Sequence, residues 1–181
     1  MLWIALFSQS GSEIVEISKR LGRYPDFIYT NNKDKKSWHK DLQKHSAVVV
    51  ENYKKIPNEI ERVISMFKLL RGNPVVTLHG YLRIMPMLSC KMYNGHPGDI
   101  VKYPELKGKD PQAKALSLGL QSTGSVLHEV TEEVDSGEII SYNTYDIKED
   151  ETLDSLIDNL RDISIGQWTK FLKEKLIEES V

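Results

Sequence analysis

Asn94-Gly95-His96-Pro97 is the segment best suited to catalysis, because it places a side-chain amide and an imidazole two residues apart. In an extended chain, side chains at positions i and i+2 point to the same side. Asn94 and His96 can then converge on one reacting oxygen, as an oxyanion-stabilising pair does. A second interpretation stays open at this stage, since Asn-Gly is also a strong signal for a tight turn.

Asp135 and the histidines are the other titratable candidates. Asp135 lies in the acidic run of residues 132–137, which is typical of a solvated turn, and spacing alone does not join it to His96. No two of the five histidines have the i, i+4 spacing of a helical metal site, and no HExxH motif occurs, which argues against a zinc hydrolase. The single cysteine, Cys90, has no adjacent base, so we predict that it is a packing residue.

The turn Ser8-Gln9-Ser10-Gly11-Ser12 follows an apolar run and precedes a helical pattern. It has neither the GxGxxG pattern of a dinucleotide site nor the GxxxxGK[ST] pattern of a nucleotide P-loop. A helix that starts here presents backbone N–H groups that can bind an anion such as phosphate. A plain helix cap is the alternative interpretation of the same residues.

Length and composition limit the scaffold that positions these residues. A chain of 181 residues without repeats or linkers predicts one domain, residues 1–181. The formal net charge of −2 argues against binding of duplex nucleic acid, which usually needs a basic stripe. No apolar run approaches the roughly 18 residues of a membrane span, and the start lacks the features of a signal peptide. We therefore expect a cytoplasmic protein without a membrane partner, as a monomer or a homodimer.

Hydrophobic patterning predicts a doubly wound α/β fold in the first half. Continuous apolar runs predict buried parallel strands at residues 2–7, 27–29, 47–50 and 74–78. Helical spacing predicts a helix after Ser12, a helical piece near residues 37–44 and a helix over residues 56–70, with Leu70 on its buried side.

The second half has a different pattern. A short strand at residues 92–94 is followed by a long loop over residues 97–111 and a helix at residues 113–118. Residues 125–130 and 138–147 read as strands that can pair antiparallel. Thr152 is a suitable cap for a last helix that runs to about Glu178, with Gly166 as the candidate point of division into two helices. The residues expected to pack inward from it are Leu156, Ile157, Leu160, Ile163, Trp168 and Leu172.

Four motifs in this order resemble the 10-formyltetrahydrofolate-dependent formyltransferases, with the single-domain phosphoribosylglycinamide formyltransferases as the nearest branch. The segments are residues 6–13, residues 78–85, the Asn94-Gly95-His96-Pro97 motif, and residues 124–128 followed by residues 132–137. Each motif alone is weak, but four in register are specific. The resemblance implies a Rossmann-like, three-layer fold with a mostly parallel sheet, helices on both faces and an antiparallel edge in the C-terminal half.

The resemblance also implies roles for individual residues. Asn94 donates a hydrogen bond to the formyl oxygen, and His96, kept partly protonated by a neighbouring carboxylate, stabilises the oxyanion. Asp135 holds His96 and a water. The co-substrate 10-formyltetrahydrofolate is expected to lie against Leu82, Arg83, Ile84, Met85, Val130 and Thr131. The amine acceptor is expected to contact Ser10, Gly11, Ser12, Glu13, Gly80 and Pro97. No metal is implied.

Departures from the family pattern concern the acceptor. Glu13 stands where the family carries Asn in its phosphate turn, and a carboxylate there repels a phosphate. His79 replaces a small residue before Gly80, and only Lys54 or Lys55 is available as the basic phosphate contact.

We therefore predict formyl transfer to a primary amine of a small, phosphorylated or nucleotide-linked acceptor, with glycinamide ribonucleotide as the first candidate. The alternatives are an amino-sugar nucleotide or a modified nucleotide as acceptor, or hydrolysis of 10-formyltetrahydrofolate. The sequence predicts neither the N-terminal regulatory domain that we associate with the hydrolases nor the C-terminal barrel of the enzymes that formylate initiator tRNA.

Overall fold

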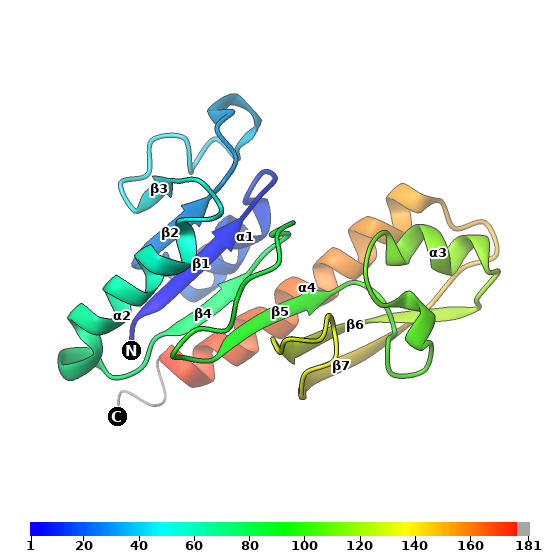
Figure 1. The fold of residues 1–181 in the computed structure, drawn as a ribbon. Coiled ribbons are helices and arrows are strands. Elements are labelled where there is room, and N and C mark those ends of the chain that lie inside the picture. The colour runs from blue at the N-terminus through cyan, green and yellow to red at the C-terminus, as the bar shows by residue number, and fades with distance from the viewer. Residues whose placement is uncertain (177–181) are drawn as a thin grey trace. The chain divides into compact units, whose positions relative to one another are not determined.

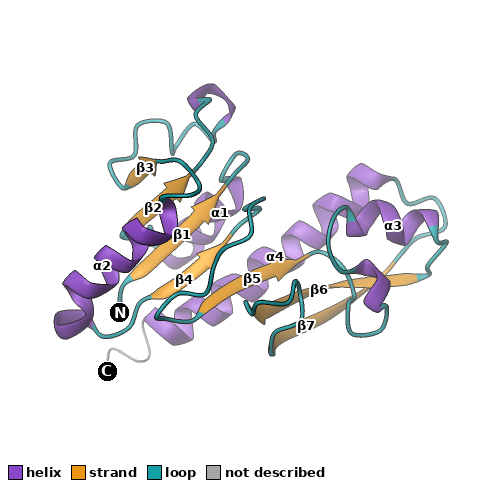
Figure 2. Ribbon diagram, in the orientation of Figure 1, coloured by secondary structure: helices purple, strands orange, loops and turns teal. Residues whose placement is uncertain are grey.

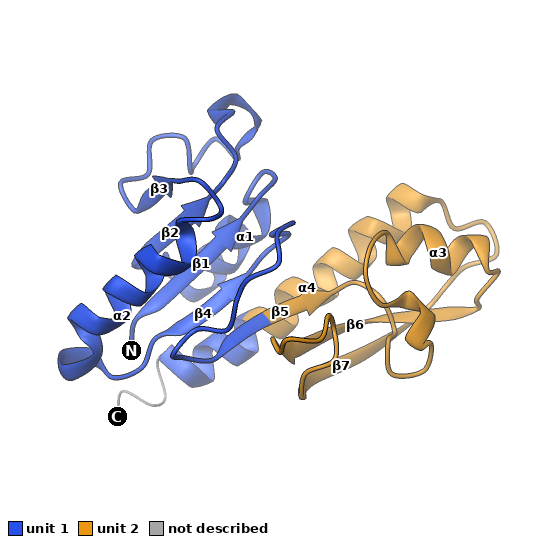
Figure 3. Ribbon diagram, in the orientation of Figure 1, with its two compact units in different colours: residues 1–93, 169–181 blue, residues 94–168 orange. Residues whose placement is uncertain are grey.

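The computed structural model describes residues 1–176, which form two compact units (Figure 3). The first unit contains residues 1–93 and the C-terminal segment from Thr169, and the second unit contains residues 94–168. The prediction of one catalytic domain over residues 1–181 stays a prediction. No helix among the described residues is long and apolar enough to cross a membrane.

The first unit carries the parallel strands. Its elements are β1 (Trp3–Phe7), α1 (Ser12–Leu21), β2 (Phe27–Thr30), a 3-10 helix (Lys35–Ser37), β3 (Val48–Val50), α2 (Ile56–Arg71) and β4 (Val75–Leu78). β1 pairs in parallel with both β2 and β4. All five residues of β1 are buried, because a strand between two parallel neighbours is covered on both faces. Figure 1 shows α2 on one face of these strands and α1 on the other.

The second unit contains a 3-10 helix (Pro104–Leu106), α3 (Pro111–Ser117), β6 (Ser122–Glu129), β7 (Ile139–Asp146) and most of α4 (Leu153–Leu176). The predicted antiparallel pairing is confirmed, since β6 and β7 pair from Ser122 with Asp146 to His128 with Ile139. A small core of Ile100, Leu106, Ala115 and Val126 fills this unit.

One sheet includes all seven strands in the order β3-β2-β1-β4-β5-β6-β7, where β5 (Met92–His96) begins in the first unit and ends in the second (Figure 2). The predicted fold class, a mostly parallel Rossmann-like sheet with an antiparallel edge, is confirmed.

Five local predictions were wrong. The strand predicted at residues 47–50 forms as β3 but is not buried, because β3 is the edge strand of the sheet and Val49 is 38% exposed. The predicted helical piece near residues 37–44 does not form: the 3-10 helix Lys35–Ser37 ends because Trp38 has an extended backbone (φ −77°, ψ 155°), and turns follow. The side chains of Trp38 and Leu42 are nevertheless buried.

α4 continues through Gly166, since one glycine costs only about 1 kcal/mol and the flanking Trp168 is fully buried. Leu70 and Ile157 are exposed by 82% and 38%, because their helices turn them toward solvent. The predicted helix end near Glu178 lies outside the described residues.

Thr152 caps α4 as predicted, because its hydroxyl accepts a hydrogen bond of 3.1 Å from the Ser155 backbone N–H. Four of the six residues predicted to pack inward from α4 are fully buried, namely Leu156, Leu160, Trp168 and Leu172.

Candidate active site

Asn94 and His96 lie on the same face of β5, as their spacing predicts. Gly95, between them, faces α4: a Cβ atom on Gly95 would lie 3.0 Å from Trp168 Nε1 and 3.4 Å from Ser164 Oγ. Because side chains alternate along a strand, Asn94 and His96 point to the opposite side from α4. The Asn-Gly pair thus belongs to a strand and not to a tight turn, and the glycine is needed for the close approach of α4.

His96 lies in a buried cluster with Asp135 and His128. His96 Nδ1 is 3.2 Å from Asp135 Oδ2, and His128 Nε2 is 3.3 Å from Asp135 Oδ1. His128 Nε2 is within ion-pair distance but outside hydrogen-bonding geometry. The structure therefore joins Asp135 to His96, which spacing alone did not do, and the solvated-turn interpretation of Asp135 was wrong because this carboxylate is buried.

His128 was missed as a member of this cluster. It ends β6 with its ring buried, and its Nδ1 lies 2.9 Å from the Glu129 carbonyl oxygen. Its position seven residues before Asp135 was the available signal.

The loop after the motif supplies two further contacts to the cluster. His96 Nε2 lies 2.8 Å from the Leu106 carbonyl oxygen, and the Gly108 backbone N–H donates to Asp135 Oδ2 at 2.9 Å. Asp99, fully buried, accepts hydrogen bonds of 2.8 Å from the Lys102 backbone N–H and from the Tyr142 hydroxyl. Asp99 therefore holds the loop that carries these contacts, a role that the sequence did not predict for it.

Burial lowers the pKa of His96 below its usual 6.5, although the Asp135 carboxylate and the Leu106 carbonyl act in the opposite direction. The predicted elevation by a neighbouring carboxylate was therefore wrong, because the desolvation of a buried imidazolium outweighs it. The pKa of Asp135 is lowered: burial opposes ionisation, but the two histidines and the Gly108 N–H outweigh it. A neutral imidazole beside a carboxylate can accept a proton and is stabilised once it is charged.

The first unit holds the serine-rich turn. Parallel β1 and β4 end side by side, so the turn after Phe7 lies against Gly80: the Ser8 N–H donates to the Gly80 carbonyl at 3.3 Å. Gly11 caps α1 with φ 69°, and Ser10 Oγ accepts from the Ser12 N–H at 3.3 Å. The predicted acceptor residues of this unit, Ser10, Gly11, Ser12, Glu13 and Gly80, thus border one turn.

Glu13 and His79, the two departures at this turn, contact each other. Glu13 Oε1 lies 2.7 Å from His79 Nδ1. His79 Nε2 lies 2.8 Å from Thr77 Oγ1, which in turn accepts from Trp3 Nε1 at 2.9 Å. The His79 side chain is fully buried, whereas the Glu13 side chain is 24% exposed. The two replacements therefore act as a pair, and the turn already contains a carboxylate.

The predicted folate residues divide between the units. In the first unit, Leu82 and Ile84 are exposed, Met85 is buried, and Arg83 stacks over the Tyr53 ring at 4.6 Å. The Leu82 N–H donates to Ser8 Oγ at 2.9 Å, which ties this segment to the serine-rich turn. Val130, Thr131 and Pro97 lie in the second unit, on the segments that follow β6 and β5.

Neither candidate for the basic phosphate contact approaches an anion partner. Lys54 Nζ lies 5.9 Å from the centre of the Tyr53 ring, and Lys55 is the residue before α2. Within residues 1–176, no group of three or more His, Cys, Asp or Glu side chains has an arrangement that could hold a metal ion.

Comparison with known proteins places the chain in a family. The model of the formyl transferase family matches residues 5–168. The formyltetrahydrofolate deformylase 2 of Arabidopsis thaliana, a mitochondrial protein, is 29% identical over 73% of this chain and 40% of its own length. The human trifunctional purine biosynthetic protein adenosine-3 is 29% identical over 61% of this chain and 11% of its own length. The chain thus spans less than half of these curated relatives.

Solved structures share the fold. The phosphoribosylglycinamide formyltransferase of Anaplasma phagocytophilum superposes with a TM-score of 0.78 at 24% identity, over 95% of this chain and 85% of that one. The fold of this chain is therefore the Rossmann-like fold of these structures. The chain belongs to the formyl transferase family, as its motifs predicted.

Proposed function

We propose that this protein transfers the formyl group of 10-formyltetrahydrofolate to a primary amine on a small acceptor. The observation that carries the proposal is the buried His96–Asp135 pair in a member of the formyl transferase family. His96 lies on β5, where Asn94 shares its face, and Asp135 lies between β6 and β7. Such a face provides a hydrogen-bond donor and a proton acceptor at one point.

The chemistry follows from the positions of these groups. The acceptor nitrogen attacks the formyl carbon, and the carbonyl oxygen becomes an oxyanion that Asn94 stabilises with its amide N–H. Neutral His96 takes the proton that the attacking nitrogen loses, and the Asp135 carboxylate at 3.2 Å stabilises the resulting imidazolium. The carbon–nitrogen bond to the folate then breaks, and His96 returns the proton to the leaving folate nitrogen.

His96 must leave its contact with the Leu106 carbonyl if Nε2 is to face the substrate. Nδ1 lies beside the Asp135 carboxylate and Nε2 beside the Leu106 carbonyl, and a neutral ring has one N–H, so it can donate to only one of these two acceptors. Binding of substrate therefore replaces the Leu106 contact with one to the reacting group.

Glycinamide ribonucleotide is the first acceptor to test, and an amino-sugar nucleotide or a modified nucleotide is the next. One relative is named a purine biosynthetic protein, and a solved structure with the same fold is a phosphoribosylglycinamide formyltransferase, which supports the first. The Glu13–His79 pair supports an acceptor that differs from the usual one at the serine-rich turn, because the Glu13 carboxylate repels a phosphate placed there.

Hydrolysis of 10-formyltetrahydrofolate is a second candidate, because a deformylase is among the relatives and water can take the place of the amine at the same residues. The purified protein should be incubated with 10-formyltetrahydrofolate, alone and with each amine, while folate absorbance and released formate are measured. Formate release without an amine identifies a hydrolase, whereas turnover that depends on one amine identifies the transferase. No turnover under any condition contradicts both.

The His96→Ala and Asp135→Asn variants test the site itself. We expect each to lower the rate by roughly 100-fold or more, the scale seen when one polar group of an oxyanion site is removed. His45→Ala is the matched control, because His45 stacks on Tyr24 in the first unit and is no part of the cluster. Full activity of His96→Ala contradicts the mechanism.

A further inference from the structure

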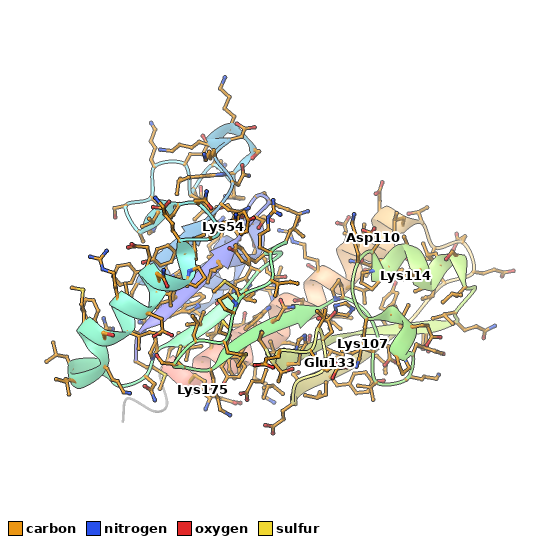
Figure 4. The ribbon with its side chains drawn as sticks, in the orientation of Figure 1. Lys54, Lys107, Asp110, Lys114, Glu133 and Lys175 are labelled. Atoms are coloured by element: carbon orange, nitrogen blue, oxygen red, sulfur yellow. The ribbon has the colours of Figure 1, made fainter. Side chains whose placement is uncertain are left out.

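Two lysines border the catalytic cluster and have no role in the mechanism above. Lys107 follows Leu106, whose carbonyl contacts His96, and its ammonium donates to Ser136 Oγ at 2.8 Å. Lys114 lies on α3, and its ammonium donates to the Lys107 carbonyl at 3.4 Å. Figure 4 shows both side chains in the second unit. The cluster is thus bordered by two positive charges.

Both ammonium groups have only uncharged partners. In the part of the chain that the structure describes, neither lies within 4.0 Å of a carboxylate. Both residues are half-buried, where an uncompensated charge is costly. An ammonium has three donors, so each lysine has donors beyond the one that its hydrogen-bond partner uses.

The acidic groups of the same region do not neutralise these lysines. The Asp135 carboxylate is used by His96, His128 and the Gly108 N–H. Asp110 and Glu133, labelled in Figure 4, are exposed and form no ion pair with either lysine. The positive charge beside the cluster is therefore available to a ligand.

We infer that Lys107 and Lys114 bind an anionic oxygen group, phosphate or carboxylate, of the amine acceptor next to His96. The inference rests on the proposed function, because it assigns the anion to the acceptor. An anion site beside His96 also agrees with the contacts of the first unit, because the Glu13 carboxylate, which is paired with His79, disfavours an anion at the serine-rich turn. A charge near the reacting centre positions the amine for attack, as bidentate clamps do in other enzymes.

Steady-state kinetics of Lys107→Gln, Lys114→Gln and the double variant test the inference. We expect the KM of the acceptor to rise roughly 10-fold or more for each variant, on the scale of a hydrogen bond to a charged group, while the KM of the folate stays unchanged. Lys109→Gln is the matched control, because Lys109 is an exposed lysine of the same loop. A rise in the folate KM with an unchanged acceptor KM assigns the lysines to the folate carboxylates and overturns the inference. Unchanged KM values for both the folate and the acceptor also overturn it.

A measurement without turnover separates this inference from the proposed function. The Lys114 charge lowers the pKa of His96, so an anion bound beside it should raise that pKa. NMR titration of the wild-type protein should show a higher pKa for the His96 ring when inorganic phosphate is added. Acetate should give a smaller rise in this pKa if the site prefers phosphate. In the double variant, neither phosphate nor acetate should change the pKa.

An unchanged His96 titration in the wild type overturns the lysine site even if transfer to an amine is observed. A phosphate effect that the double variant abolishes, together with no transfer to any amine, supports an anion site and contradicts the proposed function. Urea unfolding of each variant shows whether it is folded, and a folded variant with wild-type kinetics counts against the site.

Discussion

Replacement of Gly98 by alanine should damage the site without removing any functional group. A Cβ atom on Gly98 would lie 2.9 Å from Pro111 Cβ, 3.2 Å from His96 Nε2 and 3.3 Å from His96 Cδ2. Atoms in contact prefer about 3.5–4.0 Å, so Pro111 must move by about 0.6 Å and the His96 ring by about 0.2–0.3 Å, or residue 98 must shift between them and push the ring further. Pro111 is the first residue of α3 and has a rigid ring, so we expect the His96 ring to move.

The magnitude follows from that displacement. Overpacking of this kind costs about 1–3 kcal/mol of stability. A displacement of about 1 Å at a catalytic group can lower a rate by about 100-fold, so a smaller shift of the ring predicts a loss of roughly 10-fold to 100-fold in kcat. The change in the free energy of unfolding and the change in kcat should both appear in Gly98→Ala.

The assay combines folate absorbance or formate release with urea unfolding and NMR titration of His96. Gly166→Ala is the matched control, because a Cβ atom there meets no atom within 4 Å and alanine favours a helix by about 0.5–1 kcal/mol. Gly98→Ala with unchanged kcat and an unchanged His96 pKa would refute the reasoning, since the methyl group would then have been accommodated without moving the ring.

Three further predictions follow from the buried groups. Burial lowers the pKa of His96 in the native state, so the unfolded chain binds more protons than the native chain as pH falls below about 6.5. The free energy of unfolding should therefore fall between about pH 7.5 and 5.5, and urea unfolding should show a smaller fall for His96→Gln. His79→Ala removes the partner of Glu13 and Thr77 in a buried network and should lower the unfolding free energy by about 1–3 kcal/mol, whereas a wild-type value would show that the network contributes nothing. Burial raises the pKa of Cys90 to about 12, so iodoacetamide at pH 8 should modify it only after unfolding, and mass spectrometry of the native protein decides this.

The local pattern of the sequence was sufficient for the strands and for most helices. Continuous apolar runs predicted β1, β2 and β4 because strands inside a parallel sheet are buried on both faces. The same reasoning located β3 but predicted its burial wrongly, because the edge position of β3 depends on the topology of the sheet. Helices were predicted wrongly where tertiary packing decided. At Gly166, the cost of about 1 kcal/mol for a glycine in a helix is outweighed by the burial of neighbouring residues of α4 such as Trp168.

By itself, the sequence determined the family and the placement of Asn94 and His96 on one face of a strand, because the two residues are separated by the two-residue repeat of a strand. Only the tertiary structure decided what surrounds them. The pKa of His96 depends on its burial, the contact of Glu13 joins residues 66 positions apart, and the lysines reach the cluster from a loop and from α3. Such contacts follow from chain closure and desolvation, which no local pattern of residues records.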